Sequence, residues 1–217
     1  MSFWVHAIII LVVLTNLKLL GSSRLLACIR IVAVQGILLG LLPVLAHTEG
    51  TLARLVAQSA ASTLLKGVVF PWLLVRAVRE ADVRREVQPL VGFTMSLLAG
   101  TVLLAVGLWL GSRLPSPQPE LPGSGILVGA ALFTLMVGLF LIVSRKTALM
   151  QVLGYLAMEN GIYAFGMAFA QDQPLLVELG ILLDVFMAVF VMGIAIHHIN
   201  REFDHIDTER LSTLRDS

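Results

Sequence analysis

Seven long apolar stretches constrain this chain more than any other feature of its sequence. A helix needs about 20 mainly apolar residues to cross the roughly 30 Å hydrocarbon core of a bilayer. Each stretch is long enough to span it. The stretches are Phe3–Leu20, Leu25–Leu45, Leu52–Val75, Leu90–Leu110, Gly125–Val143, Thr147–Ala170 and Leu175–His197. The sequence therefore predicts an all-α fold, a polytopic membrane helix bundle of seven transmembrane helices.

The composition disfavours the other classes of protein. Of the 217 residues 58% are hydrophobic and 13% are charged, whereas about a quarter of a soluble domain is charged. The apolar stretches are continuous, unlike the alternating strands of a membrane β-barrel. A net charge of +1 makes a nucleic-acid-binding role unattractive. The single cysteine, Cys28, and the lack of a Cys/His cluster predict no metal or cofactor in this chain.

The basic residues predict the orientation of the bundle. Cytoplasmic loops of membrane proteins carry an excess of Lys and Arg. If the N-terminus lies outside, the outer segments hold only Arg54 and Arg113. The inner segments then hold Lys18, Arg24, Arg30, Arg76, Arg79, Arg84, Arg85, Arg145, Lys146, Arg201, Arg210 and Arg215. We therefore expect the N-terminus outside and the C-terminus in the cytoplasm.

A proline-rich segment divides the predicted bundle. Residues 112–124 are expected to form an extended outer (periplasmic) loop. This loop separates a four-helix part at 1–111 from a three-helix part at 125–200, and a cytoplasmic tail follows at 201–217. Leu64-Leu65-Lys66 and Leu182-Leu183-Asp184 align without gaps in the third and seventh stretches. The alignment suggests a degenerate three-helix repeat with opposite charges at equivalent places.

Three ionisable residues lie deep inside predicted spans: Lys66, Glu159 and Asp184. Glu178 lies about one turn inside the outer face. A charge at the centre of a membrane helix costs at least about 2.5–3.5 kcal/mol, and such residues often mark ion pathways. We therefore predict that these four residues take part in proton translocation. The plainer alternative is a polar contact that only holds helices together.

Polar side chains accompany two of these charges at helical spacing. Residues four apart share one face of a helix, and aligned polar groups can hold a chain of waters. We assign these neighbours supporting roles around the charges and no direct transfer of protons. They are Gln151, Tyr155 and Tyr163 on the helix of Glu159, and Ser59 and Ser62 on the helix of Lys66. The sequence leaves open whether Lys66 pairs with an acid of this chain or of a neighbouring one.

Two motifs resemble a known family. Met158-Glu159-Asn160-Gly161 and the segment from Val177-Glu178 to Asp184 resemble hydrogenase-4 component E. That family supplies a membrane subunit of formate-hydrogenlyase-type group 4 [NiFe] hydrogenases. The last three predicted helices are also similar to the K subunit of respiratory complex I and the C subunit of Mrp-type antiporters. In that family two intramembrane glutamates belong to a proton path; Glu159 lies about one turn from the first position, and Asp184 stands at the second.

The resemblance implies a non-catalytic subunit in the bacterial inner (cytoplasmic) membrane. Nickel–iron and iron–sulfur centres would belong to partner subunits, and this chain would contact antiporter-like membrane subunits and the membrane anchor subunit of the hydrogenase arm. Two other functions stay open at this point. The chain could be an autonomous small secondary ion transporter or a subunit of an Mrp-type cation/proton antiporter; a purely structural scaffold is a third reading.

Overall fold

The computed structural model describes residues 2–46, 56, 59–60, 62–80, 90–114, 124–169 and 193. Within these residues every regular element is a helix. The elements are α1 (Ser2–Gly21), α2 (Leu25–Ala46), the π-helix η1 (Leu65–Val69), α4 (Phe70–Glu80), α5 (Phe93–Arg113), α6 (Ser124–Ser144) and α7 (Ala148–Phe169). This confirms the all-α prediction for the described part of the chain.

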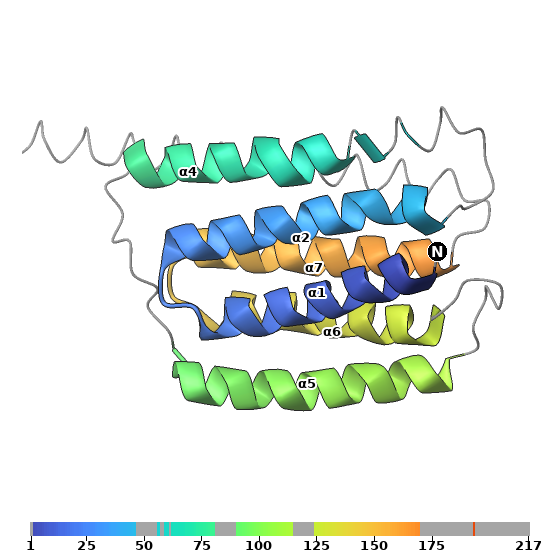
Figure 1. Cartoon of the computed structure of the whole chain (residues 1–217). Coiled ribbons are helices and arrows are strands. Elements are labelled where there is room, and N and C mark those ends of the chain that lie inside the picture. The colour runs from blue at the N-terminus through green and yellow to red at the C-terminus, as the bar shows by residue number, and fades with distance from the viewer. Residues whose placement is uncertain are drawn as a thin grey trace, which may run out of the picture.

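The long helices lie side by side, with α4 at one edge of the bundle and α5 at the other (Figure 1). The centre is formed by α1, α2, α6 and α7: α1 packs against α2 and α6, and α7 packs against the same two helices. On the outer sides, α5 contacts α6 and α1, whereas η1 and α4 contact α2. Segments that are far apart in sequence, such as α2 and α7, therefore become neighbours.

Glycines allow α6 and α7 to approach closely. A methyl group on Gly161 would lie 2.5 Å from the backbone nitrogen of Leu135, and one on Gly154 would lie 2.9 Å from the carbonyl oxygen of Gly138. Neither position has room for a side chain without movement of the partner backbone. Small residues at helix contacts are the usual means of tight packing between membrane helices, since the apolar lipid offers little hydrophobic driving force.

Four helices in the described part of the chain are long and apolar enough to cross a membrane: Phe3–Gly21, Leu25–Leu45, Phe93–Arg113 and Gly125–Ser144. Helix α7 has the length of a span, but polar residues near its centre lower its apolarity. The ends of the first, second, fifth and sixth predicted stretches agree with α1, α2, α6 and α7 to within one residue. The seventh stretch lies, apart from residue 193, outside the described residues, as do the tail and most of the loop at 112–124.

The fourth predicted stretch is displaced along the chain. Helix α5 begins at Phe93 and not at Leu90, because Leu90 is instead tied to the end of α6: its N–H donates to the carbonyl oxygen of Ser144 at 2.9 Å. At the other end the helix continues to Arg113. Leu114 is extended (ψ 134°), as expected for a residue that precedes a proline, here Pro115.

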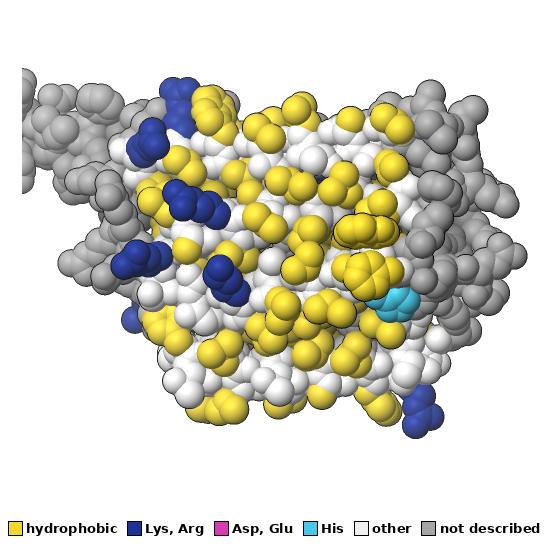
Figure 2. All heavy atoms as spheres, viewed as in Figure 1, with side chains coloured by type: hydrophobic (Ala, Val, Ile, Leu, Met, Phe, Trp, Pro, Cys, Tyr) yellow, Lys and Arg dark blue, Asp and Glu magenta, His cyan; other side chains and the backbone are white. Residues whose placement is uncertain are grey.

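Basic side chains gather at one end of the bundle, where α1 and α6 end and α2, α5 and α7 begin. We call this the basic end. Figure 2 shows Lys and Arg concentrated toward it on the visible face, with hydrophobic side chains over most of the remainder. The exposed cations there are Lys18, Arg24, Arg30, Arg76, Arg79 and Lys146.

Arg145 differs from the exposed cations of the basic end because it is buried. It connects α6 to α7, yet it is only 1% exposed. Its Nη2 donates to the carbonyl oxygen of Leu20 at 2.9 Å and to Oγ of Ser96 at 3.4 Å, and its Nη1 donates to the carbonyl oxygen of Val91 at 3.3 Å. Burial lowers the pKa of the Arg145 guanidinium, which still remains protonated because its ordinary pKa is so high. Arg145 thus fastens the basic ends of α1 and α5 to the α6–α7 turn.

Candidate functional site

Lys66 lies on the irregular turn of the helix that leads into α4. In η1 the N–H of Phe70 donates to the carbonyl oxygen of Leu65, five residues back. Pro71 follows directly, and proline has no N–H to donate while its ring crowds the carbonyl four residues earlier. The wider π turn accommodates this disruption, and such turns occur frequently at functional sites. The proline in the sequence therefore places an irregular turn of the backbone at the buried residue Lys66.

Gly36 of α2 allows the Lys66 backbone to approach. A methyl group on Gly36 would lie 2.7 Å from Cβ of Lys66 and 3.1 Å from its carbonyl carbon and oxygen. Because this face of the lysine is closed by α2, its long side chain extends toward α7. The glycine on α2 and the π turn together position the ammonium group between the two helices.

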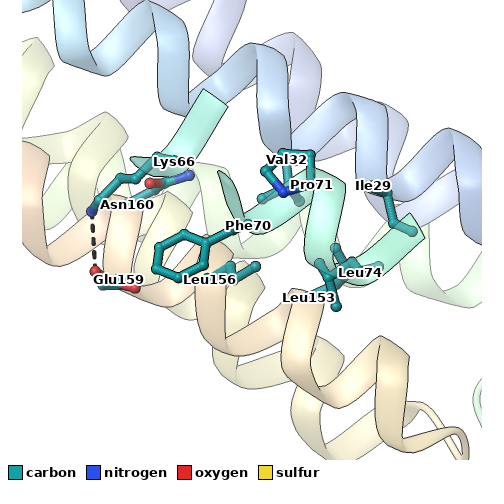
Figure 3. Close-up of a pocket in the computed structure, with 10 residues that line it drawn as sticks. All are labelled: Ile29, Val32, Lys66, Phe70, Pro71, Leu74, Leu153, Leu156, Glu159 and Asn160. Atoms are coloured by element: carbon teal, nitrogen blue, oxygen red, sulfur yellow. Dashed lines mark ion pairs between the residues drawn. The ribbon is translucent and has the colours of Figure 1, made fainter. Parts of the chain in front are cut away.

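Lys66 and Glu159 form a buried ion pair (Figure 3). Nζ of Lys66 lies 3.2 Å from Oε1 of Glu159, and the two side chains are 7% and 3% exposed. Each charge alone would be costly at this depth, so their attraction offsets part of the cost of removing both from water. The structure thus answers for Lys66 the question that the sequence leaves open: it pairs with an acid of its own chain.

The Glu159 carboxylate has spare hydrogen-bonding capacity. Among the described residues no group donates a well-aligned hydrogen bond to either of its oxygens, so its described polar contact is the ion pair. A cavity of about 10 Å³ adjoins the pair, which is close to the space that one water occupies. It is lined by Ile29, Val32, Lys66, Phe70, Pro71, Leu74, Leu153, Leu156, Glu159 and Asn160.

A chain of buried amides crosses the bundle beside the ion pair. Nδ2 of Asn160 donates to Oε1 of Gln35 at 3.1 Å, and Nε2 of Gln35 donates to Oδ1 of Asn16 at 3.0 Å. Nδ2 of Asn16 donates to Oγ1 of Thr134 at 2.8 Å. The chain joins α7, α2, α1 and α6. Because its residues alternate as donor and acceptor, it orders the four helices around Glu159.

Sequence reasoning about ionisable residues missed this amide chain. Asn16, Gln35 and Asn160 are nearly inaccessible to solvent, and each lies within a predicted span. A buried amide needs hydrogen-bond partners as a buried charge does. The signal that could have found the chain is therefore the presence of an amide within each of three predicted spans.

Two of the predicted supporting residues, Tyr163 and Ser62, lie near the pair, and a third, Ser59, lies two turns from Lys66 along its helix. Tyr163 is partly buried, with Nζ of Lys66 5.1 Å from the centre of its ring. The hydroxyl of Ser62 is close enough to that of Tyr163 to interact. Ser59 is buried one turn further along and donates to the carbonyl oxygen of Gly40.

Other predicted site residues are not brought to the pair. Gln151 is exposed near the basic end, where its Nε2 donates to the carbonyl oxygen of Arg145 at 3.3 Å. Tyr155 packs against the apolar core between Gln151 and Glu159. Asp184 and Glu178 lie outside the described residues, and so does half of the suggested three-helix repeat.

No metal-ligand set is present among the residues that the structure describes, since no three His, Cys, Asp or Glu side chains come together there. Cys28 is buried and forms no disulfide. The arrangement around Lys66 and Glu159 contains no activated nucleophile within the described residues. What it offers is a carboxylate and an ammonium group in an apolar bundle. Protonation of the carboxylate, or loss of a proton from the ammonium group, changes the charge of the pair.

The described residues define a class of protein: an all-helical chain with four helices long and apolar enough to cross a membrane, and with a buried lysine–carboxylate pair. Its relatives then give the family. The chain is 36% identical over 209 residues to the uncharacterized protein Rv0085 of Mycobacterium tuberculosis, covering 94% of this chain and 92% of that one. It is 30% identical over 163 residues to hydrogenase-4 component E of Escherichia coli and of Shigella flexneri, covering 75% of this chain and 74% of each relative. The chain belongs to the hydrogenase-4 component E family.

No family model matches the chain. No solved structure matches it either. The family assignment therefore depends on the similarity to component E over three quarters of the chain.

Proposed function

We propose that this chain is a non-catalytic membrane subunit of a group 4 [NiFe] hydrogenase of the hydrogenase-4 or formate-hydrogenlyase type, and that it couples redox chemistry in the peripheral subunits to proton translocation. The observation that carries the proposal is the buried Lys66–Glu159 pair at 3.2 Å. Its occurrence in a relative of hydrogenase-4 component E supports membership of a hydrogenase complex. In this account the nickel–iron and iron–sulfur centres belong to partner subunits.

The pair has the chemistry that coupling requires. While Glu159 is ionised, its attraction holds the Lys66 ammonium; a proton that reaches Glu159 neutralises the carboxylate and removes that attraction. Because the surroundings are apolar, charges in neighbouring subunits act on the pair with little screening. A charge change elsewhere in the complex would therefore shift the proton affinity of Glu159. Asp184 and Glu178 would extend this path within the chain.

The proposal includes partners and a location. The chain would lie in the bacterial inner membrane with its basic end in the cytoplasm, as the distribution of Lys and Arg favours. It would contact the membrane anchor subunit of the hydrogenase arm on one side and antiporter-like subunits on another. The many exposed apolar side chains of α5 are compatible with lipid or with such a subunit.

Purification and reconstitution test the proposal. An affinity-tagged chain, extracted from native membranes in mild detergent, is expected to carry large hydrogenase and antiporter-like subunits with it. The chain purified alone and placed in liposomes that contain a pH-sensitive dye is expected to give no proton or sodium flux. Flux by the chain alone would favour an autonomous transporter. Recovery with antiporter subunits but no hydrogenase subunit would favour an Mrp-type antiporter.

A further inference from the structure

Three hydroxyl groups near the ion pair lie on the same side of it along the bundle axis. Ser62 and Thr63 precede Lys66 by about one turn, on a helix that runs toward the basic end. Tyr163 follows Glu159 by one turn on α7, which runs away from the basic end. All three hydroxyl groups therefore lie on the side of the pair that faces away from the basic end. We call Ser62, Thr63 and Tyr163 the outer hydroxyl cluster.

The outer hydroxyl cluster is buried and incompletely hydrogen-bonded. The hydroxyl oxygens of Ser62, Thr63 and Tyr163 are inaccessible to solvent. Ser62 and Tyr163 are close enough to interact with each other, but none of the three has a well-aligned hydrogen bond to any described residue. A buried polar group without a partner is unfavourable, and buried hydroxyls commonly satisfy themselves with ordered water. The cluster adjoins the Lys66–Glu159 pair, because the Tyr163 ring lies beside the Lys66 ammonium group.

Among the described residues, the side of the pair toward the basic end is lined by apolar side chains. Phe70 and Leu74 lie about one and two turns beyond Lys66, and Leu153 and Leu156 precede Glu159 on α7; all four are buried. Figure 3 shows these side chains meeting between α4 and α7, adjacent to the pair. We call these four residues the inner apolar layer. Apolar constrictions of this kind exclude water and so interrupt proton transfer.

We propose that water reaches Glu159 through the outer hydroxyl cluster, from the end of the bundle opposite the basic end, while the inner apolar layer closes the site toward the basic end. This inference depends on the proposed function for the role of Glu159 as a proton carrier. It specifies the end of the bundle from which the Glu159 carboxylate exchanges its proton in this conformation. A hydronium ion in the cluster gives its proton to the Glu159 carboxylate and becomes water, and Glu159 becomes neutral.

Silver ion is a suitable probe, since it is small, moves with water and blocks thiols. Cys28 is first replaced by alanine, which removes the one native thiol. Ser62→Cys then reports on the outer hydroxyl cluster. Val32→Cys reports on the cavity that Glu159 shares with the inner apolar layer, because Val32 lines that cavity. Silver is added to one side of sealed membrane vesicles that contain the full complex, and the free thiols are counted with a maleimide after denaturation.

Two exposed positions mark the sides of the vesicle membrane. Ser112 lies at the end of α5 opposite the basic end, and Ser23 lies in the α1–α2 turn at the basic end. Ser112→Cys and Ser23→Cys, each labelled with a membrane-impermeant maleimide, establish which side the silver has reached. If Ser62→Cys does not assemble into the complex, Thr63→Cys replaces it as the reporter.

The expected result is loss of maleimide labelling at position 62 after silver is added on the Ser112 side, with full labelling at positions 62 and 32 after silver is added on the Ser23 side. Full labelling at position 62 after silver is added on the Ser112 side would overturn the inference. Loss of labelling at position 32 after silver is added on the Ser23 side would overturn it as well. Because no proton flux is measured, this result is independent of whether Glu159 translocates protons.

Discussion

Single replacement of either partner in the ion pair, Lys66→Met or Glu159→Gln, is expected to destabilise the bundle by about 3–5 kcal/mol, because each leaves an uncompensated group in a buried site. With Lys66→Met the carboxylate loses the one polar contact described for it. With Glu159→Gln an ammonium group faces a neutral amide. The double replacement is expected to cost clearly less than the sum of the two, because it removes both charges.

Equilibrium unfolding in mixed detergent micelles, followed by circular dichroism, gives the free energies for this double-mutant cycle. Lys18→Gln is the matched control, because it removes an exposed cation from α1, and a surface change of this kind is expected to stay within about 0.5 kcal/mol. If the costs of Lys66→Met and Glu159→Gln simply add in the double variant, the two side chains do not interact, and the pair does not hold the bundle together.

Replacement of Arg145 by glutamine is expected to have the second large effect, a loss of about 3 kcal/mol or more, because hydrogen bonds to charged donors contribute about 1.5–3 kcal/mol each. Arg145 donates to Leu20 at the end of α1 and to Val91 and Ser96 around the start of α5. A glutamine amide cannot reach all three acceptors. Arg145→Lys is also expected to destabilise, since an ammonium group lacks the planar fork of the guanidinium.

The neighbouring residue provides the control for this prediction. Lys146 carries the same charge but is exposed, so Lys146→Gln changes the net charge by the same amount and removes no buried contact. Resistance of the folded chain to limited proteolysis in micelles, together with its unfolding midpoint, measures both variants. Equal effects of Arg145→Gln and Lys146→Gln would mean that charge, and not the buried hydrogen bonds, accounts for the loss.

Hydrophobic continuity predicted most of the helices well because it is a local property. Helices α1, α2, α6 and α7 begin and end where apolar stretches meet polar residues. The start of α5 could not be predicted in this way. It depends on a hydrogen bond from Leu90 to Ser144, which only the folded bundle brings together.

The site was predictable in its charges but not in its connections. A lysine and a glutamate deep within apolar stretches are conspicuous in the sequence, and the structure brings Lys66 and Glu159 together. Their partners are set by tertiary packing, so no feature of the sequence indicated that Asn160 is linked through Gln35 to α1. The burial of Arg145 was hidden for a related reason: a basic residue at a helix end is typical of a solvated loop, and only the packing of α1 and α5 around it shows otherwise.

Helical spacing overestimated the extent of the polar row on α7. Gln151, Tyr155, Glu159 and Tyr163 share one face of the helix by their four-residue spacing, but the surroundings change along that face. Gln151 lies at the exposed basic end, whereas Glu159 lies in the buried centre. The spacing predicts which residues share one face of a helix, but it does not predict which residues of other helices cover that face.

The central claim is that Glu159, held by Lys66, carries protons for the complex. The most direct test is the number of protons translocated per hydrogen molecule turned over in sealed inner-membrane vesicles, for the native complex and for Glu159→Gln, with Lys18→Gln as the control. Although the Glu159→Gln bundle is expected to be less stable, we expect each assembled Glu159→Gln complex to retain hydrogenase turnover with a soluble electron acceptor and to lose proton translocation. Unchanged translocation per hydrogen molecule in a fully assembled Glu159→Gln complex would contradict the account.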